Sequence, residues 1–244
     1  FYNGDAFYYS GSSWRVIAAL GTCLGEQGYN IRLHQNGIAG KIQTDQMLQF
    51  SWLDALVSFR GEPENLLKLS QKIPVVAIDS RSCPELPSVL LQEEAIPEEI
   101  RKLCLREQCE ECLFLHAETS DDTLHQFGEI LRLRNERPLV HEINLKEPEF
   151  EKSLRTLLNR KKRILLVHYN QYTRLIQRIR AEYPDTVVTL SYDHPLQKEV
   201  YIGYSVDFPW ADVAQSAALL LQEAMNDRSH PRQIVCMPEI QHWN

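Results

Sequence analysis

Short apolar runs alternate with amphipathic helical stretches along most of this chain, and that alternation most constrains its fold. Residues 74–78, Pro-Val-Val-Ala-Ile, form a continuous apolar run, as expected of a strand that is covered on both faces. Residues 112–116 and 163–167 are similar runs, and each precedes a stretch with helical periodicity. Strands that alternate with helices of about ten or more residues indicate parallel sheets with helices on both faces. We therefore predict an α/β fold.

The remaining elements follow from the same two patterns, apolar runs for strands and apolar residues at helical spacing for helices. No internal repeat and no low-complexity segment interrupts them. We expect strands at 29–34, 55–59, 74–78, 112–116, 138–143, 163–167, 186–190, 200–205 and 233–237. We expect helices at 13–24, 43–52, 63–69, 96–107, 121–134, 148–158, 171–183 and 208–225.

Length and charge limit the number of domains and the class of partner. The 244 residues suit one large domain or two lobes of about 100–150 residues each. A surface that binds nucleic-acid phosphates is usually basic, whereas this chain has 33 acidic residues against 26 Lys and Arg and a formal net charge of −7. No apolar run approaches the ~20 residues of a membrane helix. We therefore expect no membrane span and no nucleic-acid contact by this chain itself.

The start of the chain and its cysteines bear on the compartment. The chain opens on Phe1 rather than Met and shows no secretory signal, so we expect that it was cut from a longer protein. Six cysteines, three of them within nine residues, are typical of a reduced cytoplasmic protein rather than of a disulfide framework. We predict a cytoplasmic location, with a secreted protein whose signal has been removed as the alternative.

Two stretches carry a resemblance to a known family. The first is Ile-Pro-Val-Val-Ala-Ile-Asp-Ser-Arg at 73–81, followed by Leu-Pro-Ser-Val at 86–89. The second is Thr-Leu-Ser-Tyr-Asp-His at 189–194, followed by an Ala-rich helix around 214–221 and a closing strand within 233–239. In their joint order and spacing, these stretches resemble the effector-binding core of the lactose/galactose repressor (LacI/GalR-like) family, which shares the fold of periplasmic sugar-binding proteins.

The resemblance implies a periplasmic-binding-protein-like type I fold, in which two doubly wound parallel-sheet lobes are joined by three crossing segments. Mapped onto this chain, the N-terminal lobe comprises residues 1–107 plus 200–227, and the C-terminal lobe comprises 108–199 plus 228–244. The family's DNA-binding head has no counterpart in this chain.

Ligands of open α/β sheets bind beyond the carboxyl ends of the strands. An aromatic ring beside carboxylates suits a polyol, because the ring covers the apolar sugar face while the carboxylates accept hydrogen bonds from hydroxyls. The resemblance implies the same loops, with Phe7 or Tyr8 as the aromatic wall. The predicted ligand-binding residues are Asp5, Phe7, Tyr8, Asp79, Arg81, Gln92, Glu93, His116, His168, Asn170 and Asp193.

Three positions depart from the family pattern. Gln92-Glu93 stands where the family usually has Asp-Asn, and His125-Gln126 stands where it usually has an Arg on the helix after the sixth strand. The stretch 168–171, His-Tyr-Asn-Gln, replaces a usual Asn-Asp. The ordinary sugar-clamping residues are thus largely replaced, so either the ligand is unusual or the pocket no longer binds a sugar.

The cysteines and histidines raise the question of a metal site. The spacing of Cys104, Cys109, Cys112 and His116 could suggest zinc or an iron–sulfur cluster. We favour the interpretation that these thiols pack inside a helix and beside the next strand. We therefore predict neither a metal nor a cofactor. No G-x-S-x-G elbow, P-loop, G-x-G-x-x-G or H-E-x-x-H motif occurs, which speaks against an enzyme.

The resemblance implies the ligand-sensing and dimerisation core of a bacterial transcriptional regulator. A small, sugar-like effector in the cleft between the lobes would modulate DNA binding by the attached head, and the core would form a homodimer. An extracytoplasmic solute-binding or chemosensory protein of the same fold is the alternative, and an α/β enzyme is the less favoured third reading.

Overall fold

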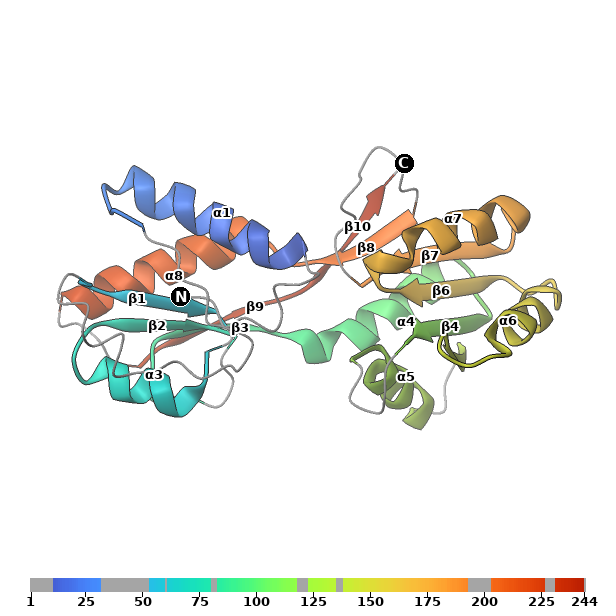
Figure 1. Cartoon of the computed structure of the whole chain (residues 1–244), viewed down its shortest axis with the longest axis horizontal. Coiled ribbons are helices and arrows are strands. Elements are labelled where there is room, and N and C mark those ends of the chain that lie inside the picture. Colours follow the sequence, from blue (N-terminus) through green and yellow to red (C-terminus); the bar gives the residue numbers. More distant parts are fainter. Residues whose placement is uncertain are drawn as a thin grey trace. The chain divides into compact units, whose positions relative to one another are not determined.

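The computed structural model describes residues 11–31, 53–59, 61–79, 83–117, 123–134, 138–192, 203–226 and 231–243, except for the side chains of 11–14 and 170. The chain divides into two compact units (Figure 1). The first unit contains Phe1–Gln92 and Phe208–Met237, and the second contains Glu93–Asp207 and Pro238–Asn244. The chain therefore passes three times from one unit to the other, which confirms the predicted fold class.

The first unit is built on a four-stranded parallel sheet of order β1-β2-β3-β9. Helix α8 packs against β2 and β3, α1 packs on α8, and α3 packs against β2. All four residues of β2 are buried, as the apolar run at 74–78 predicts for a strand covered on both faces. The elements are α1 Gly11–Glu26, β1 Leu56–Phe59, α3 Pro63–Ser70, β2 Val75–Ile78, β3 Ser88–Leu91, α8 Trp210–Met225 and β9 Gln233–Cys236.

The second unit is built on a six-stranded sheet of order β10-β8-β7-β6-β4-β5. Its strands are parallel except for the edge strand β10, which runs antiparallel to β8. Its helices are α4 Ile96–Arg106, α5 Thr123–Leu133, α6 Phe150–Leu158 and α7 Thr173–Glu182, with 3₁₀ turns η2 Glu93–Ala95 and η3 Asn170–Tyr172. Its strands are β4 Glu111–His116, β5 Leu139–Asn144, β6 Ile164–His168, β7 Val187–Ser191, β8 Gly203–Asp207 and β10 Glu239–Trp243.

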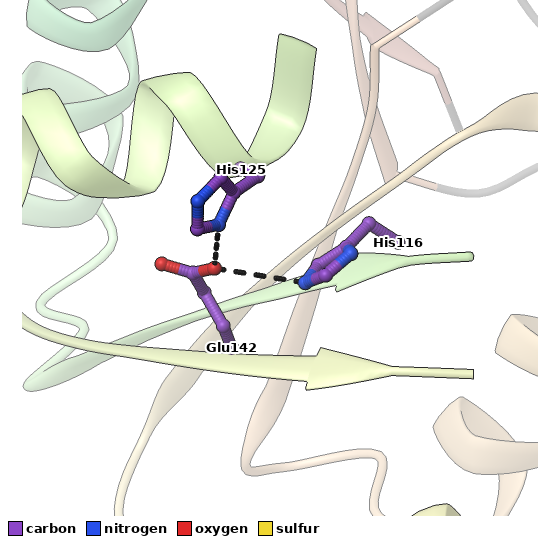
Figure 2. A group of neighbouring side chains, drawn as sticks. All are labelled: His116, His125 and Glu142. Carbon is purple, nitrogen blue, oxygen red and sulfur yellow. Dashed lines mark hydrogen bonds and ion pairs between the residues drawn. The ribbon is translucent and has the colours of Figure 1, made fainter. Parts of the chain in front are cut away.

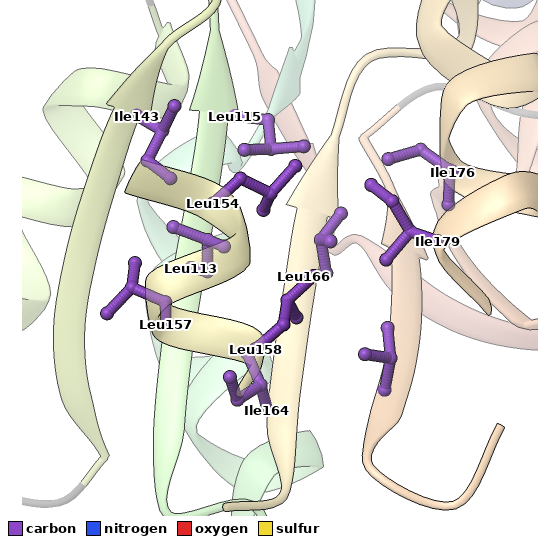
Figure 3. Close-up of a cluster of buried hydrophobic side chains, with 11 residues drawn as sticks. Leu113, Leu115, Ile143, Leu154, Leu157, Leu158, Ile164, Leu166, Ile176 and Ile179 are labelled. Atoms are coloured by element: carbon purple, nitrogen blue, oxygen red, sulfur yellow. The ribbon is translucent and has the colours of Figure 1, made fainter. Parts of the chain in front are cut away.

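One face of the second sheet carries an apolar core beneath α6 and α7 (Figure 3). Leu113 and Leu115 alternate along β4, and Leu113 lies opposite Leu166 of β6 in the strand register. Because side chains alternate across a strand, Phe114 and His116 lie on the other face, where α5 packs against β4 and β5. Both faces carry buried apolar side chains, and the face under α5 also carries the site described below.

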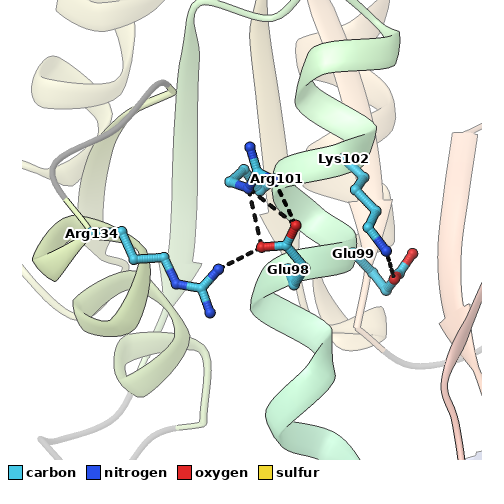
Figure 4. Close-up of polar contacts among 5 residues, drawn as sticks. All are labelled: Glu98, Glu99, Arg101, Lys102 and Arg134. Carbon is cyan, nitrogen blue, oxygen red and sulfur yellow. Dashed lines mark hydrogen bonds and ion pairs between the residues drawn. The ribbon is translucent and has the colours of Figure 1, made fainter.

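The predicted lobe boundaries need correction. Helix α4 belongs to the second unit, because its Glu98 binds Arg101 and also Arg134 at the end of α5 (Figure 4). These arginines hold the pKa of Glu98 at about 2. Strand β8 also belongs to the second unit, because it pairs with β7, whereas β9 pairs with β3 in the first.

Other predicted elements fall partly outside the described residues. The expected helix at 43–52 lies wholly outside them. Of the expected strand at 29–34, the described residues 29–31 form no strand. Strand β10 is an addition that the sequence did not predict, and its Trp243 Nε1 donates a hydrogen bond of 2.8 Å to Ser205 Oγ of β8. In the described part of the chain, no helix is both long and apolar enough to cross a bilayer.

Candidate functional site

Polar side chains collect at the carboxyl ends of the second sheet's strands. Strands β4, β6, β7 and β8 end at His116, His168, Ser191 and Asp207, all of them buried. Since these strands are parallel, their ends meet at one edge of the sheet. Buried polar groups are uncommon without a structural or functional partner. This edge is therefore the candidate ligand-binding site of the second unit.

A cluster of His116, His125 and Glu142 lies at this edge (Figure 2). Glu142 of β5 lies beside Phe114 in the strand register, so it shares a sheet face with His116 at the end of β4. His125 comes from the first turn of α5, which covers that face. Glu142 Oε2 lies 3.6 Å from His116 Nε2 and contacts His125 Nδ1. The two imidazole rings lie 5.7 Å apart.

The carboxylate of Glu142 is fixed from both sides. Its Oε1 accepts a hydrogen bond of 2.6 Å from Arg132 Nη2, and Arg132 also pairs with Glu129. The hydrogen bond from His125 to Glu142 raises the pKa of His125, because the imidazolium gains an anionic partner. Gly128 leaves room for this carboxylate, since a Cβ atom there would lie 2.8 Å from Glu142 Oε1.

Three aromatic rings lie beside the same ends of the strands. Phe127 of α5 packs edge-on against Tyr192, which follows β7, at 5.7 Å between centroids. Tyr192 in turn packs edge-on against Tyr169, which follows β6, also at 5.7 Å. Both tyrosines are half-buried. Such rings supply apolar faces and hydroxyl groups next to the polar cluster, a combination that suits a ring-shaped polar ligand.

His168 has a different environment from His116. It lies opposite Leu115 in the strand register, on the face that carries the apolar core, and its side chain is fully buried. Its Nδ1 lies 2.9 Å from the carbonyl oxygen of Tyr169, so Nδ1 carries the proton and donates it. Burial lowers the pKa of His168 to about 4, so the ring is neutral at pH 7. The structure thus separates these two predicted site residues.

In the first unit, the described candidates also follow strand ends. Asp79 directly follows β2 with φ of 56°, a left-handed conformation that Asp tolerates, and its N–H donates to Val89 O. Gln92 follows β3 and is half-buried. Glu93 begins η2 and belongs to the second unit.

The other predicted site residues cannot be placed in this way. Asn170 opens η3, but its side chain is outside the described part. The remaining candidates lie wholly outside the described residues, namely Asp5, Phe7, Tyr8, Arg81 and Asp193.

Sequence reasoning missed Glu142 and Arg132 and noted His125 only as a departure from the family pattern. The signal for Glu142 was present, because residues 138–143 read as a strand of Pro-Leu-Val-His-Glu-Ile with a carboxylate in its interior. A charged residue within such a strand needs a partner when it is covered. Its partners His125 and Arg132 are on α5, the helix before β5, and their spacing in the sequence does not reveal the contact.

Comparisons with known proteins agree with the fold. No family model and no curated protein matches the chain in sequence. A LacI family transcriptional regulator from Arthrobacter sp. FB24 in complex with lactose matches with a TM-score of 0.73 and 10% identity, over 99% of this chain and 96% of that one. A LacI transcriptional regulator from Lactobacillus brevis matches with a TM-score of 0.72 and 15% identity, over 98% of each chain.

A third similar structure is a periplasmic binding protein/LacI transcriptional regulator from Alkaliphilus metalliredigens QYMF in complex with D-xylulofuranose. It has a TM-score of 0.71 and 12% identity, and the match covers 100% of this chain and 97% of that one. These neighbours are regulators or binding proteins. The likeness confirms the periplasmic-binding-protein-like type I fold predicted from the sequence.

Proposed function

We propose that this chain is the ligand-sensing core of a transcriptional regulator and binds a small, hydroxyl-rich molecule at the carboxyl ends of its strands. The observation that carries the proposal is the match to regulators over nearly the full length of both chains. Two of those regulators hold a sugar, lactose in one and D-xylulofuranose in the other. The buried polar edge and its three aromatic rings support a ligand of this kind.

The proposed mechanism is a population shift. A ligand that binds one arrangement of the two units more tightly than another would favour that arrangement. DNA binding would come from a separate head, because the core carries a formal net charge of −7, whereas a surface that binds phosphates is usually basic. We further propose that the core is a cytoplasmic homodimer without enzymatic activity, so that two heads would read two half-sites.

The proposal is tested by a thermal-shift screen across sugars, sugar phosphates, sugar acids and nucleosides. A ligand bound only by the folded state at a hundred times its Kd adds about 2.7 kcal/mol, or roughly 5–10 °C in Tm for a chain of this size. A hit should also change the DNA affinity of the complete regulator in a mobility-shift assay. A screen without any hit in these classes, or a hit that leaves DNA affinity unchanged, contradicts the proposal.

Replacing Tyr192 by Leu is expected to weaken the best hit by about tenfold or more, because a large aromatic contact is lost from the site. The matched control is Tyr183→Leu, which removes a half-buried tyrosine that follows α7 and binds Asn159. Affinity is measured by calorimetry. Equal losses in both variants would mean that Tyr192 acts through stability alone.

The Asp193→Ala variant tests the sequence-based site outside the described residues. We expect it to abolish the thermal shift while the melting temperature without ligand stays nearly unchanged, since a carboxylate that accepts hydrogen bonds from the ligand would be lost. An undiminished shift removes Asp193 from the site.

A further inference from the structure

We propose that His116, His125 and Glu142 form a binding site for a divalent transition-metal ion, which Zn²⁺ will occupy. The three side chains each offer one ligand atom, and these atoms all lie within 4.8 Å of one another. Two imidazoles and one carboxylate are a donor set that divalent zinc and its neighbours in the first transition row accept. The site goes beyond sugar sensing and can be tested without any sugar or DNA.

The spacing fits an ion held between these groups. Ligand atoms about 2.0–2.2 Å from a tetrahedral ion lie about 3.4 Å from one another. Glu142 Oε2 and His116 Nε2 are already 3.6 Å apart. These two groups come from adjacent paired strands and lie on the same face of the sheet, so the backbone keeps them near each other.

His125 is the group that must move. Its Nδ1 is in hydrogen-bond contact with Glu142 Oε2, and an ion would enter between these two atoms and displace the proton that they share. The His125 side chain is 30% exposed and lies in the first turn of α5, so its ring can rotate away. With three protein ligands, a tetrahedral ion keeps its fourth position for water or a bound ligand.

The surroundings favour a cation. Arg132 holds Glu142 Oε1 and leaves Oε2 facing the two imidazoles, which is how an outer partner orients a metal ligand. Arg132 is itself paired with Glu129, so two carboxylates face a single guanidinium in this group. The local charge is therefore negative when both histidines are neutral.

The cysteines near β4 are the rival metal site in this unit. Thiols bind metals as thiolates. Burial raises the pKa of Cys109 to about 12 and that of Cys112 well above its ordinary value. Without a metal, both thiols therefore stay protonated at neutral pH. Among the described residues, the one group that brings three ligand atoms together is the histidine–glutamate cluster.

The experiment is a Zn²⁺ titration of chelator-stripped protein, in competition with a chromophoric chelator, together with the Co²⁺ absorption spectrum. We expect one ion per chain, no thiolate-to-cobalt charge-transfer band, and at least a hundredfold loss of affinity in His125→Gln and in Glu142→Gln. His141→Gln and His242→Gln should bind as the parent does, because neither residue belongs to the cluster. Unchanged binding in the first two variants, equal loss in the controls, or a thiolate band overturns the proposal.

Gly128→Ala tests the site without removing a ligand. The new Cβ would lie 2.8 Å from Glu142 Oε1 and push the carboxylate out of place. We expect a loss of zinc affinity of about 10–100-fold, the usual effect of disturbing a ligand's orientation. The matched control is Gly21→Ala, a helical position with open space around it. If Gly128→Ala folds and binds zinc as tightly as the control does, the inference is wrong. A negative sugar screen would leave this result unaffected.

Discussion

Acidification from pH 7 to pH 4 is expected to cost the folded protein about 3 kcal/mol through His168 alone. Its pKa is about 4 in the folded state against 6.5 as the ordinary value, because the ring is fully buried on the core face. Each unit of difference corresponds to about 1.4 kcal/mol. The unfolded chain therefore takes up the proton first, so stability is complete above about pH 6.5 and falls as the pH drops toward 4.

The measurement is the free energy of unfolding by urea at several pH values between 7 and 4, with a chelator present. His168→Gln removes the titrating group, so its stability should fall by about 3 kcal/mol less than that of the parent over this range. His242→Gln, at an exposed position on β10, should follow the parent curve. His125 acts in the opposite sense because its pKa is raised, so the difference between variant and parent is the quantity to compare. If the unfolding free energies of His168→Gln and the parent fall in parallel with pH, the buried His168 is not the source of the pH dependence.

The strands of this fold could be predicted because a strand buried on both faces has a continuous run of apolar residues in the sequence. The apolar runs at 74–78 and 163–167 became β2 and β6 within one residue at each end. The edge strand β10 has no such run, because its Glu-Ile-Gln-His-Trp sequence is mostly polar and its pairing with β8 comes from distant residues. Edge pairing is decided by tertiary contacts that a local pattern does not record.

The predicted lobe boundaries were wrong for a related reason. Strands β8 and β9 both read as short apolar runs, and nothing local says that β8 adds to β7 while β9 adds to β3. The mapping onto the family pattern placed β8 in the N-terminal lobe and β9 in the C-terminal lobe, which is the reverse of the structure. Register between distant strands depends on which faces can be buried together, and the fold as a whole determines this.

Part of the site could also be read from the sequence. His116 was predicted because it ends an apolar strand, and it does lie at the carboxyl edge. His168 was predicted by the same rule, but the alternation along β6 places it on the face of Leu166, beneath the core helices. Parity along each strand does not separate the two histidines, because both strands are apolar on both faces. The strand register, in which Leu115 lies opposite His168, separates them. The contact between His125 and Glu142 depends on how α5 packs on the sheet, which no spacing reveals.

Removing the charge of Lys162 is expected to destabilise the protein by about 2–3 kcal/mol. Glu111 opens β4 with its side chain fully buried, at the amino end of the sheet, where Lys162 Nζ lies 3.0 Å from its Oε1. His141 Nε2 lies 3.2 Å from Oε2, and burial lowers the pKa of His141, so Lys162 supplies the positive charge at pH 7. Lys162→Met would leave the buried Glu111 carboxylate without a positively charged partner. The cost is below the ~3–5 kcal/mol of a fully buried pair, because the lysine is 42% exposed.

The double variant Glu111→Met with Lys162→Met separates this effect from a loss of packing. Replacing both charges by apolar groups of similar volume is often neutral, so the double variant should recover most of the stability that Lys162→Met loses. Lys152→Met is the matched control, because Lys152 pairs with Glu149 in full solvent and should change stability by less than about 0.5 kcal/mol. Urea unfolding at pH 7 compares all three variants with the parent chain. If the double variant is no more stable than Lys162→Met, the buried charge of Glu111 is not the source of the loss, and the lysine stem acts by packing.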